Sequence, residues 1–288
     1  EGRILATIKH RAVIDVYASD TDEAVQAPFL VMELVDGLTL EAAENTLRGD
    51  LPRLLQLFIE LLEGIHACHQ KGIIHRDLKP ANVLINRSGQ LKIVDFGVAK
   101  TARKVTRTGV TVGTPHYMAP EQCLGKSEIT AAADTYSIGI MFWEMLVGKL
   151  PFDVDSGATD PALTIALKHL NEAAPIEQIS EDPRTAPFAD LLRGMLSKNP
   201  DDRPTIPDII ESLKMRMKAS VPGAATTEAD PDMIGEIYRI ERVLGQGGMG
   251  TVYKALDTAL NRSVAIKMLN PNISTDEKIV ERFIKEGQ

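Results

Sequence analysis

A short segment in the first third of the chain carries the side chains needed to transfer a phosphoryl group. Asp77, Lys79 and Asn82 lie in the run His75-Arg-Asp-Leu-Lys-Pro-Ala-Asn82, and Asp95 begins Asp-Phe-Gly. A carboxylate such as Asp77 can accept a hydroxyl proton, and a nearby lysine can hold phosphate oxygens. Amide and carboxylate oxygens are ligands that Mg²⁺ accepts. The spacing therefore predicts phosphoryl transfer, and the alternative is a polar loop between a helix and a hairpin.

A glycine cluster near the end of the sequence also suits phosphate chemistry. It reads Gly245-Gln-Gly-Gly-Met-Gly250, and glycines without a Cβ let backbone N–H groups approach an anion. A plain hairpin turn is the alternative. A dinucleotide-binding loop is disfavoured, since strand-like residues rather than a helix follow the cluster. Lys267 ends the apolar run Val264-Ala-Ile-Lys267, where it is either a surface lysine or a partner for the α- and β-phosphates.

Helical patterns dominate the longer, N-terminal part of the chain. Apolar residues recur at helical spacing over 51–70, which predicts a largely buried helix. The run 136–146 is apolar nearly throughout, as expected for a helix in the middle of a helical domain. Cys68, His66 and His69 lie together on the first of these helices, and we assign them to packing and capping rather than to a metal site.

Strand-like patterns dominate the remainder of the chain. Residues 219–236 are rich in Ala, Thr, Pro, Asp and Gly with neither a helical nor a strand period, which predicts a linker. Strands are expected over 238–244, 251–256 and 263–269, because these runs have strand-like composition. Ser274 begins a capping-box pattern for a helix. A small β-rich piece therefore follows a larger helical one.

The composition excludes several classes of protein. The chain has 288 residues, of which 44% are apolar and 25% charged, as in a globular protein rather than a disordered or fibrous one. The formal charge of −8 disfavours a nucleic-acid partner. Only Cys68 and Cys123 are present, which excludes a disulfide framework and a four-cysteine zinc site. No run approaches the about 20 apolar residues of a membrane span, and no signal-peptide layout is seen, so we expect a cytoplasmic protein.

Together these motifs resemble the eukaryotic-type (Hanks-type) Ser/Thr protein kinases, and the loop GQGGMGTVYKA is most similar to the bacterial branch. Further matching residues are Ala119-Pro-Glu121, Asp134-Thr-Tyr-Ser-Ile-Gly139 and Arg203, and Glu121 is expected to form a structural ion pair with Arg203. The segment Gly113-Thr-Pro-His-Tyr-Met118 is similar to the Ser/Thr-specific version. The resemblance implies protein substrates that carry Ser or Thr. It also implies a two-lobed α+β fold, with a small antiparallel β-sheet lobe plus one helix, a larger, mainly helical lobe, and ATP between them.

The resemblance assigns the catalytic work to the first segment described above. It implies that Asp77 is the catalytic base and that Lys79 steadies the γ-phosphate. It implies that Asn82 and Asp95 hold Mg²⁺, with Mn²⁺ as the alternative metal. ATP and the divalent metal are therefore the expected cofactors.

The resemblance also implies an ATP site spread over several segments. Lys267 is expected to pair with Glu286 and to hold the phosphates. The hinge residues Glu33 and Val35 are expected to bond adenine through their backbones, beside Met32 as gatekeeper. The complete set of expected ATP-binding residues is Leu244, Gly245, Gln246, Gly247, Gly248, Gly250, Val252, Ala265, Lys267, Met32, Glu33, Val35 and Leu84.

An arginine beside the expected catalytic base indicates how activity is regulated. The side chain of Arg76 requires an anion to neutralise it, and Thr106, Thr108 and Thr111 lie among basic residues in the segment 98–118. Phosphorylation of one of them would supply charge and acceptor oxygens that order this segment. We therefore expect activation by autophosphorylation, and solvated loop hydroxyls are the alternative.

The order of the motifs departs from that of the resembled family, in which the glycine loop and the strand lysine precede the catalytic loop. We therefore divide the chain into 1–218, with the second part of the glutamate helix, the hinge and the helical lobe, the linker 219–236, and 237–288, with the start of the small lobe. Glu286 and Glu1 both match the glutamate partner of the strand lysine. We choose Glu286 because it lies on the same continuous stretch.

Two connectivities and more than one function are compatible with this order. The chain is either a circularly permuted kinase or a segment of a tandem-kinase chain, and the repeated Glu-Gly favours the second. In both cases the pieces can complement each other within one chain or in a swapped dimer. The functional alternative is a pseudokinase or scaffold that the broken order leaves inactive. A small-molecule kinase is disfavoured, because residues 113–121 resemble a peptide-docking segment.

Overall fold

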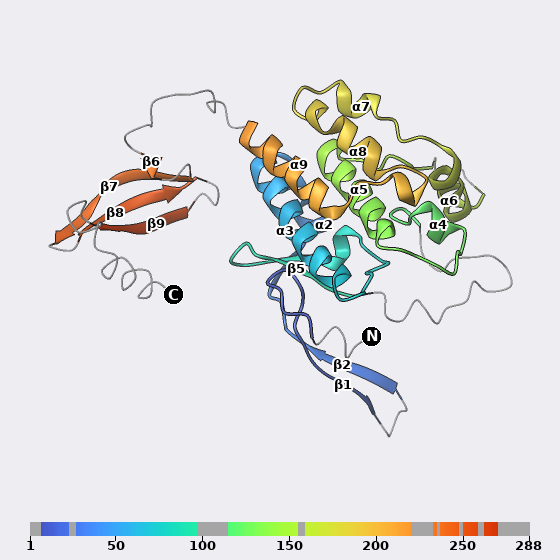
Figure 1. The fold of residues 1–288 in the computed structure, drawn as a ribbon, viewed down its shortest axis with the longest axis horizontal. Helices are drawn as coiled ribbons and strands as arrows, with labels where there is room; N and C mark the ends of the chain where they lie inside the picture. The colour runs from blue at the N-terminus through green and yellow to red at the C-terminus, as the bar shows by residue number, and fades with distance from the viewer. Residues whose placement is uncertain are drawn as a thin grey trace. The chain divides into compact units, whose positions relative to one another are not determined.

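The chain divides into two compact units, Glu1–Ser220 and Val221–Gln288. The computed structural model describes residues 7–22, 27–96, 115–154, 159–219, 233–234, 237–247, 250–258 and 262–269. Within them, helices make up most of the first unit, and strands make up the second (Figure 1). This division into a mainly helical part and a β-rich part agrees with the α+β class predicted from the sequence.

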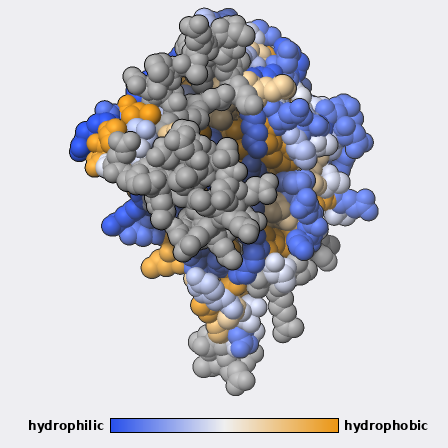
Figure 2. Space-filling view, turned by 60° about the vertical axis from the view of Figure 1, so that its left-hand side comes forward, coloured by the Kyte–Doolittle hydropathy of each residue, from blue (hydrophilic) through white to orange (hydrophobic). Residues whose placement is uncertain are grey.

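Two small sheets accompany the helices of the first unit. β1 (Val16–Asp22) and β2 (Ala27–Met32) form an antiparallel hairpin. β3 (Gly37–Thr39), β4 (Val83–Asn86) and β5 (Leu91–Ile93) form an antiparallel sheet in the order β3-β4-β5. The hairpin forms a narrow projection from the body of the unit, and orange apolar atoms lie on its surface in Figure 2.

The helices of the first unit pack around α3 and α5. The described helices are α2 (Leu40–Arg48), α3 (Leu51–His69), α4 (Pro120–Cys123), α5 (Ala132–Val147), α6 (Pro161–Asn171), α7 (Glu177–Ser180), α8 (Ala189–Met195) and α9 (Ile206–Ala219), with 3₁₀ turns η1 (Pro80–Asn82), η3 (Ala186–Phe188) and η4 (Pro200–Asp202). α9 lies against α3, and α8 lies against α5. Among these described segments, no helix is long and apolar enough to cross a membrane.

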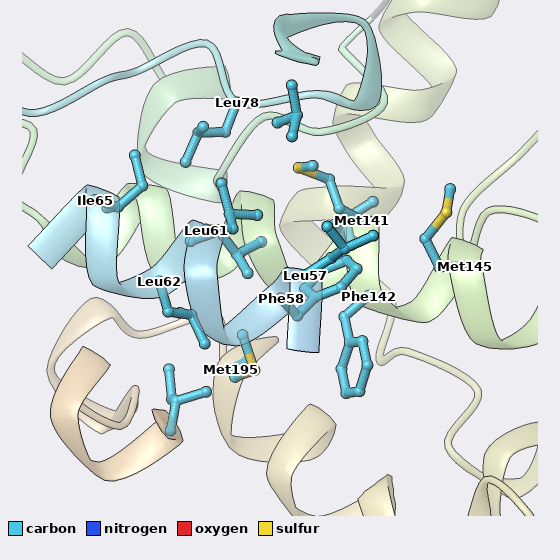
Figure 3. Packing of buried hydrophobic residues seen from close by; sticks show 14 of the residues in the cluster. Leu57, Phe58, Leu61, Leu62, Ile65, Leu78, Met141, Phe142, Met145 and Met195 are labelled. Carbon is cyan, nitrogen blue, oxygen red and sulfur yellow. The ribbon is translucent and has the colours of Figure 1, made fainter. Parts of the chain in front are cut away.

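α3 confirms the buried helix predicted over 51–70. It begins at Leu51 because the side chain of Asp50 accepts a hydrogen bond from the backbone N–H of Arg53, which caps the first turn. The chain leaves it through Gly72, whose φ of 73° favours glycine. In Figure 3, Leu57 and Phe58 of α3 lie beside Met141 and Phe142 of α5, and the rings of Phe58 and Phe142 have centroids 4.8 Å apart.

α5 confirms the apolar helix predicted over 136–146 and lies at the centre of the core. Nearly all of its residues are buried, and Trp143 and Phe142 are among its largest side chains. Gly139 allows α8 to approach closely, because a Cβ there would come within 3.0–3.1 Å of Leu196 and Met195. The middle of α5 is therefore closely packed against the end of α8.

The second unit is an antiparallel sheet with strand order β6-β7-β8-β9. Its longer strands, β7 (Tyr238–Gly247), β8 (Gly250–Asp257) and β9 (Arg262–Leu269), confirm the three strands predicted there. The division between the two units falls inside the linker predicted over 219–236. Within that range α9 includes Ala219 and β6 (Met233–Ile234) pairs with β7, a pairing that two residues without a strand period do not reveal, and the rest of the range lies outside the described residues. The helix expected from Ser274 lies outside the described residues.

A buried histidine of α6 makes the stability of the first unit depend on pH. Nδ1 of His169 lies 2.9 Å from the Tyr136 hydroxyl, and its Nε2 has no hydrogen-bond partner among the described residues. Burial, together with the nearby Lys198 ammonium, lowers the pKa of His169 from 6.5 to about 3. The folded protein therefore keeps this imidazole neutral at a pH where the unfolded chain protonates it.

We expect the free energy of unfolding to fall as the pH is lowered below 6.5, by about 1.4 kcal/mol per pH unit from His169 alone. The sign follows because the unfolded state binds the proton and the folded state does not. Urea unfolding between about pH 5.5 and pH 4, where a histidine in the unfolded chain is almost fully protonated and His169 in the folded protein is mostly neutral, measures this slope. A His169→Gln variant should have a slope smaller by that amount. An equal slope in both proteins would show that His169 does not titrate as described.

Candidate active site

A buried carboxylate fixes the backbone of the segment that carries the expected catalytic residues. Asp134, in the first turn of α5, accepts hydrogen bonds from the backbone N–H of His75 (2.9 Å) and of Arg76 (2.9 Å). Nε2 of His69 lies 2.7 Å from the same carboxylate. The side-chain amide of Gln122 donates to the Arg76 carbonyl at 2.8 Å. Residues from α3, α4 and α5 therefore hold this segment in place.

These contacts stabilise an unusual backbone. Among the residues that the structure describes, Arg76 (φ 66°) and Asp95 (φ 56°) are the only non-glycine residues with positive φ. Such conformations are strained for residues with a Cβ and persist where the surrounding structure enforces them. Arg76 directly precedes Asp77, and Asp95 is itself an expected metal ligand. Both strained positions therefore lie at predicted functional residues, where backbone strain tends to concentrate.

Asp77, Lys79 and Asn82 lie together at the end of this segment. Nδ2 of Asn82 donates to the carbonyl of Asp77 at 2.9 Å and lies 3.4 Å from its Oδ2. Nζ of Lys79 is 3.5 Å from Oδ2 of Asp77. Pro80 begins the 3₁₀ turn η1, which places Asn82 at the end of that turn and directly before β4. The sequence-predicted base, lysine and amide are thus neighbours in the structure.

Asp95 follows β5 beside the same segment. The backbone N–H of Val94 donates to the Asn82 carbonyl at 3.0 Å, and Nε2 of His75 lies 3.0 Å from the Val94 carbonyl. The His75 ring packs against Phe96 with centroids 4.6 Å apart, and burial lowers the pKa of His75. The Asp95 carboxylate is exposed and accepts no hydrogen bond from the described residues, which suits a ligand for a hard cation.

The expected adenine-binding residues occupy the stretch between β2 and β3. Met32 ends β2, and the backbone N–H of Glu33 donates to the Asp15 carbonyl at 2.9 Å. Neither the carbonyl of Glu33 nor the N–H of Val35 has a partner among the described residues. Leu84, in β4, is partly buried against the core. The two groups expected to bond adenine are therefore available.

The remaining expected ATP-binding residues lie in the second unit. Gly245 pairs with Val252, and Val252 pairs with Lys267, so these positions form one row across β7, β8 and β9. Ala265 lies two residues before Lys267 and so belongs to the same face of the sheet. Gln246, Gly247 and Gly250 form the hairpin end of β7 and β8, and Leu244 is exposed beside it.

Several expected functional residues lie outside the described part of the chain. They are Gly248, Glu286, Thr106, Thr108 and Thr111. The pairing of Lys267 with a glutamate and the expected phosphorylation sites therefore stay predictions.

Asp134 and His69, which hold the catalytic segment, had no predicted role in the site, whereas one structural pair was predicted. An acidic residue such as Asp134 at the start of an otherwise apolar helix is a signal for a buried carboxylate with partners. His69 was expected to serve in packing and capping, and its ring Nε2 lies 2.7 Å from the Asp134 carboxylate. The ion pair expected between Glu121 and Arg203 is confirmed, with Nη1 and Oε1 2.7 Å apart and both side chains buried.

Comparison with known proteins gives a consistent result for the first unit. The family model described as the protein kinase domain matches residues 1–213. A probable serine/threonine-protein kinase, pknA2, of Bifidobacterium longum is 38% identical over 212 residues, which cover 71% of this chain and 26% of that protein. Serine/threonine-protein kinase PknB of Mycolicibacterium smegmatis is 35% identical over 213 residues, covering 70% of this chain and 33% of that protein. The matched part thus spans only about a quarter to a third of these relatives.

Proposed function

The chain belongs to the protein kinase domain family, and from this we propose that it transfers the γ-phosphoryl group of ATP to Ser and Thr hydroxyls of protein substrates. The observation that carries the proposal is the group formed by Asp77, Lys79 and Asn82. The Asp77 carboxylate lies 3.5 Å from Nζ of Lys79 and 3.4 Å from Nδ2 of Asn82, and Nδ2 of Asn82 also donates to the Asp77 carbonyl. The names of the related kinases support Ser and Thr as the acceptors.

In this proposal each residue contributes by position and charge. Asp77 accepts the proton of the substrate hydroxyl and orients its oxygen toward the phosphorus. Lys79 holds the oxygens of the transferred group as negative charge develops on them. Asn82 donates to the Asp77 carbonyl and so keeps the base in place. Positioning and electrostatic stabilisation account for most of the expected rate enhancement.

The donor set at this site suits Mg²⁺, with Mn²⁺ as the alternative. Asn82 and Asp95 provide hard oxygen atoms, and the Asp95 carboxylate is exposed without a hydrogen-bond donor among the described residues. Mg²⁺ is usually held by one or two protein oxygens together with phosphate oxygens and water. When bound, the ion neutralises charge on the phosphates of ATP. We assign Asn82 and Asp95 to hold it.

We assign adenine to the hinge and the phosphates to the glycine hairpin. The unpartnered carbonyl of Glu33 and N–H of Val35 support the first assignment. The row formed by Gly245, Val252 and Lys267 supports the second, because it places a lysine and a glycine turn on neighbouring strands.

The test is transfer of labelled phosphate from Mg-ATP to a library of Ser- and Thr-containing peptides, with Asp77→Asn as the reference. Transfer by the wild type well above the reference supports the kinase. A wild type that binds Mg-ATP but transfers no more phosphate than the reference would indicate the scaffold instead.

We also propose that autophosphorylation activates the enzyme, and we expect phosphate on Thr106, Thr108 or Thr111. The supporting observation is Arg76, whose Nε–H is buried without a hydrogen-bond partner among the described residues and so can donate to an anionic group. Incubation with Mg-ATP followed by mass spectrometry of the tryptic peptides locates the phosphate. Alanine at all three positions should lower the activity of the pre-incubated enzyme by about tenfold or more. Unmodified peptides in an active preparation would refute this.

The motif order leads to a further proposal about assembly. We propose that β7, β8 and β9 complete a kinase domain, through permuted or tandem connectivity or by exchange between two copies. The β1–β2 hairpin supports this, because Phe29 is 45% exposed and its neighbours Leu30 and Val31 are similarly exposed. Analytical ultracentrifugation over a range of concentrations would detect the exchanged dimer.

We also propose a cytoplasmic location. The proposed use of ATP and the free cysteines Cys68 and Cys123 support it.

A further inference from the structure

An almost fully buried lysine of β5 contacts the side chain of Glu33, the first of the expected hinge residues that bond adenine. Lys92 lies in the middle of β5, and its Nζ is 2.8 Å from Oε2 of Glu33, the first residue after β2. The side chain of Lys92 is 9% exposed and that of Glu33 is 26% exposed. Burying an ammonium group is unfavourable unless an anion compensates it. Glu33 therefore provides the counter-charge that allows Lys92 to occupy this position.

The same glutamate is held by a second segment. Its Oε2 accepts from the backbone N–H of Asp15 at 3.3 Å, and its own backbone N–H donates to the Asp15 carbonyl at 2.9 Å. The residues before Asp15 are in turn bonded to β5, since Ile14 donates to the Ile93 carbonyl at 3.1 Å and Ile93 donates to the Ala12 carbonyl at 2.7 Å. Three segments far apart in the sequence thus meet at the carboxylate of Glu33.

We propose that the Glu33–Lys92 ion pair is a positioning pair that fixes the hinge backbone for adenine. The inference rests on the proposed function, in which the Glu33 carbonyl and the Val35 N–H bond the base. A side chain anchored to β5 and a backbone anchored to Asp15 leave the Glu33 carbonyl little freedom to turn. Because β5 leads directly to Asp95, the pair also connects the adenine end of the nucleotide site with the metal end.

Neutralising either partner tests the proposal. Lys92→Met and Glu33→Gln should each raise the Kd for Mg-ATP by about tenfold, the factor that corresponds to one hydrogen bond to a charged group. In Lys92→Met the value of kcat at saturating ATP should change by less than about threefold, because this substitution leaves Asp77, Lys79 and Asn82 intact. Amide hydrogen exchange of Glu33, whose N–H donates to the Asp15 carbonyl, should become about tenfold faster in both variants.

Lys9→Met is the matched control. It makes the same chemical change in an ion pair of the same neighbourhood, since Nζ of Lys9 is 2.7 Å from Asp15, but Lys9 is largely exposed. We expect its Kd for Mg-ATP and its hinge exchange to equal those of the wild type.

The outcomes separate this proposal from the proposed function. Unchanged hinge exchange and unchanged Kd in Lys92→Met and Glu33→Gln, with only a lower melting temperature, would overturn the positioning role. If the wild type neither binds Mg-ATP nor transfers phosphate, the proposed function fails, and hinge exchange alone still decides whether the pair fixes the hinge. Two variants are used so that the test survives a folding failure. If Lys92→Met does not fold, Glu33→Gln still tests the pair, because glutamine keeps the shape of the glutamate side chain.

Discussion

We expect Asp77→Asn to lower kcat for phosphoryl transfer by about 10²–10⁴-fold, the contribution typical of a positioned general base. An amide cannot accept the hydroxyl proton at neutral pH, while its size is nearly that of the carboxylate. The hydrogen bond from Asn82 to the backbone carbonyl of residue 77 does not depend on the side chain, so the segment should keep its conformation. Steady-state kinetics with Mg-ATP and a peptide substrate give kcat, and calorimetry gives the Kd for Mg-ATP, which should stay within about threefold of the wild type.

Asp190→Asn controls for the chemical change. Asp190 lies on α8, its side chain is 88% exposed, and its ion pair with Arg193 is a surface pair. We expect wild-type kcat from this variant, because exposed ion pairs of this kind contribute little to stability. Full activity of Asp77→Asn, or equal losses in the two variants, would exclude Asp77 as the base.

Glu121→Gln should have the largest effect on stability, lowering the free energy of unfolding of the first unit by about 3–5 kcal/mol. The side chain of Arg203 is 0% exposed and that of Glu121 is 3% exposed. Two hydrogen bonds join them, from Nη1 to Oε1 at 2.7 Å and from Nη2 to Oε2 at 2.8 Å. Glutamine would remove the negative charge and place an NH₂ donor against a guanidinium donor, so that a buried cation loses its compensation.

Urea unfolding measures this loss, with Asp190→Asn as the exposed-pair control. The control should lose at most about 1 kcal/mol. In thermal unfolding, Glu121→Gln should melt at least about 6 °C below the wild type, since each kcal/mol shifts a domain of this size by about 2–4 °C. Similar stability of Glu121→Gln and the control would show that the carbonyls of Ser197 and Ala132, which also accept from Arg203, suffice to compensate the buried cation.

The elements that the sequence predicts correctly are those whose signal is local. α3 follows from apolar residues at helical spacing together with Asp50 as a cap and Gly72 beyond its end, all within about twenty residues. The group formed by Asp77, Lys79 and Asn82 is likewise predicted from one short motif. β6 could not be predicted, because two residues have no period and pair only when β7 is present.

The parts of the site that could not be predicted depend on contacts between distant segments. Glu33 and Lys92 are ordinary charged residues in sequence, and only the fold brings them together and buries the lysine. The positive φ values of Arg76 and Asp95 are equally hidden, since neither is a glycine. The bond between His69 and Asp134 joins two helices whose crossing the sequence pattern does not fix.

The anchoring of the catalytic segment to α5 has a consequence for how the protein tolerates change. Asp134 belongs to a helix that is surrounded by core residues on nearly every side, so it cannot move unless that core rearranges. The backbone conformation next to Asp77 therefore depends on the packing of the hydrophobic core around α5, and not only on neighbouring residues. We therefore expect substitutions deep in the core, at Trp143 or Phe142 for example, to alter catalysis from a distance.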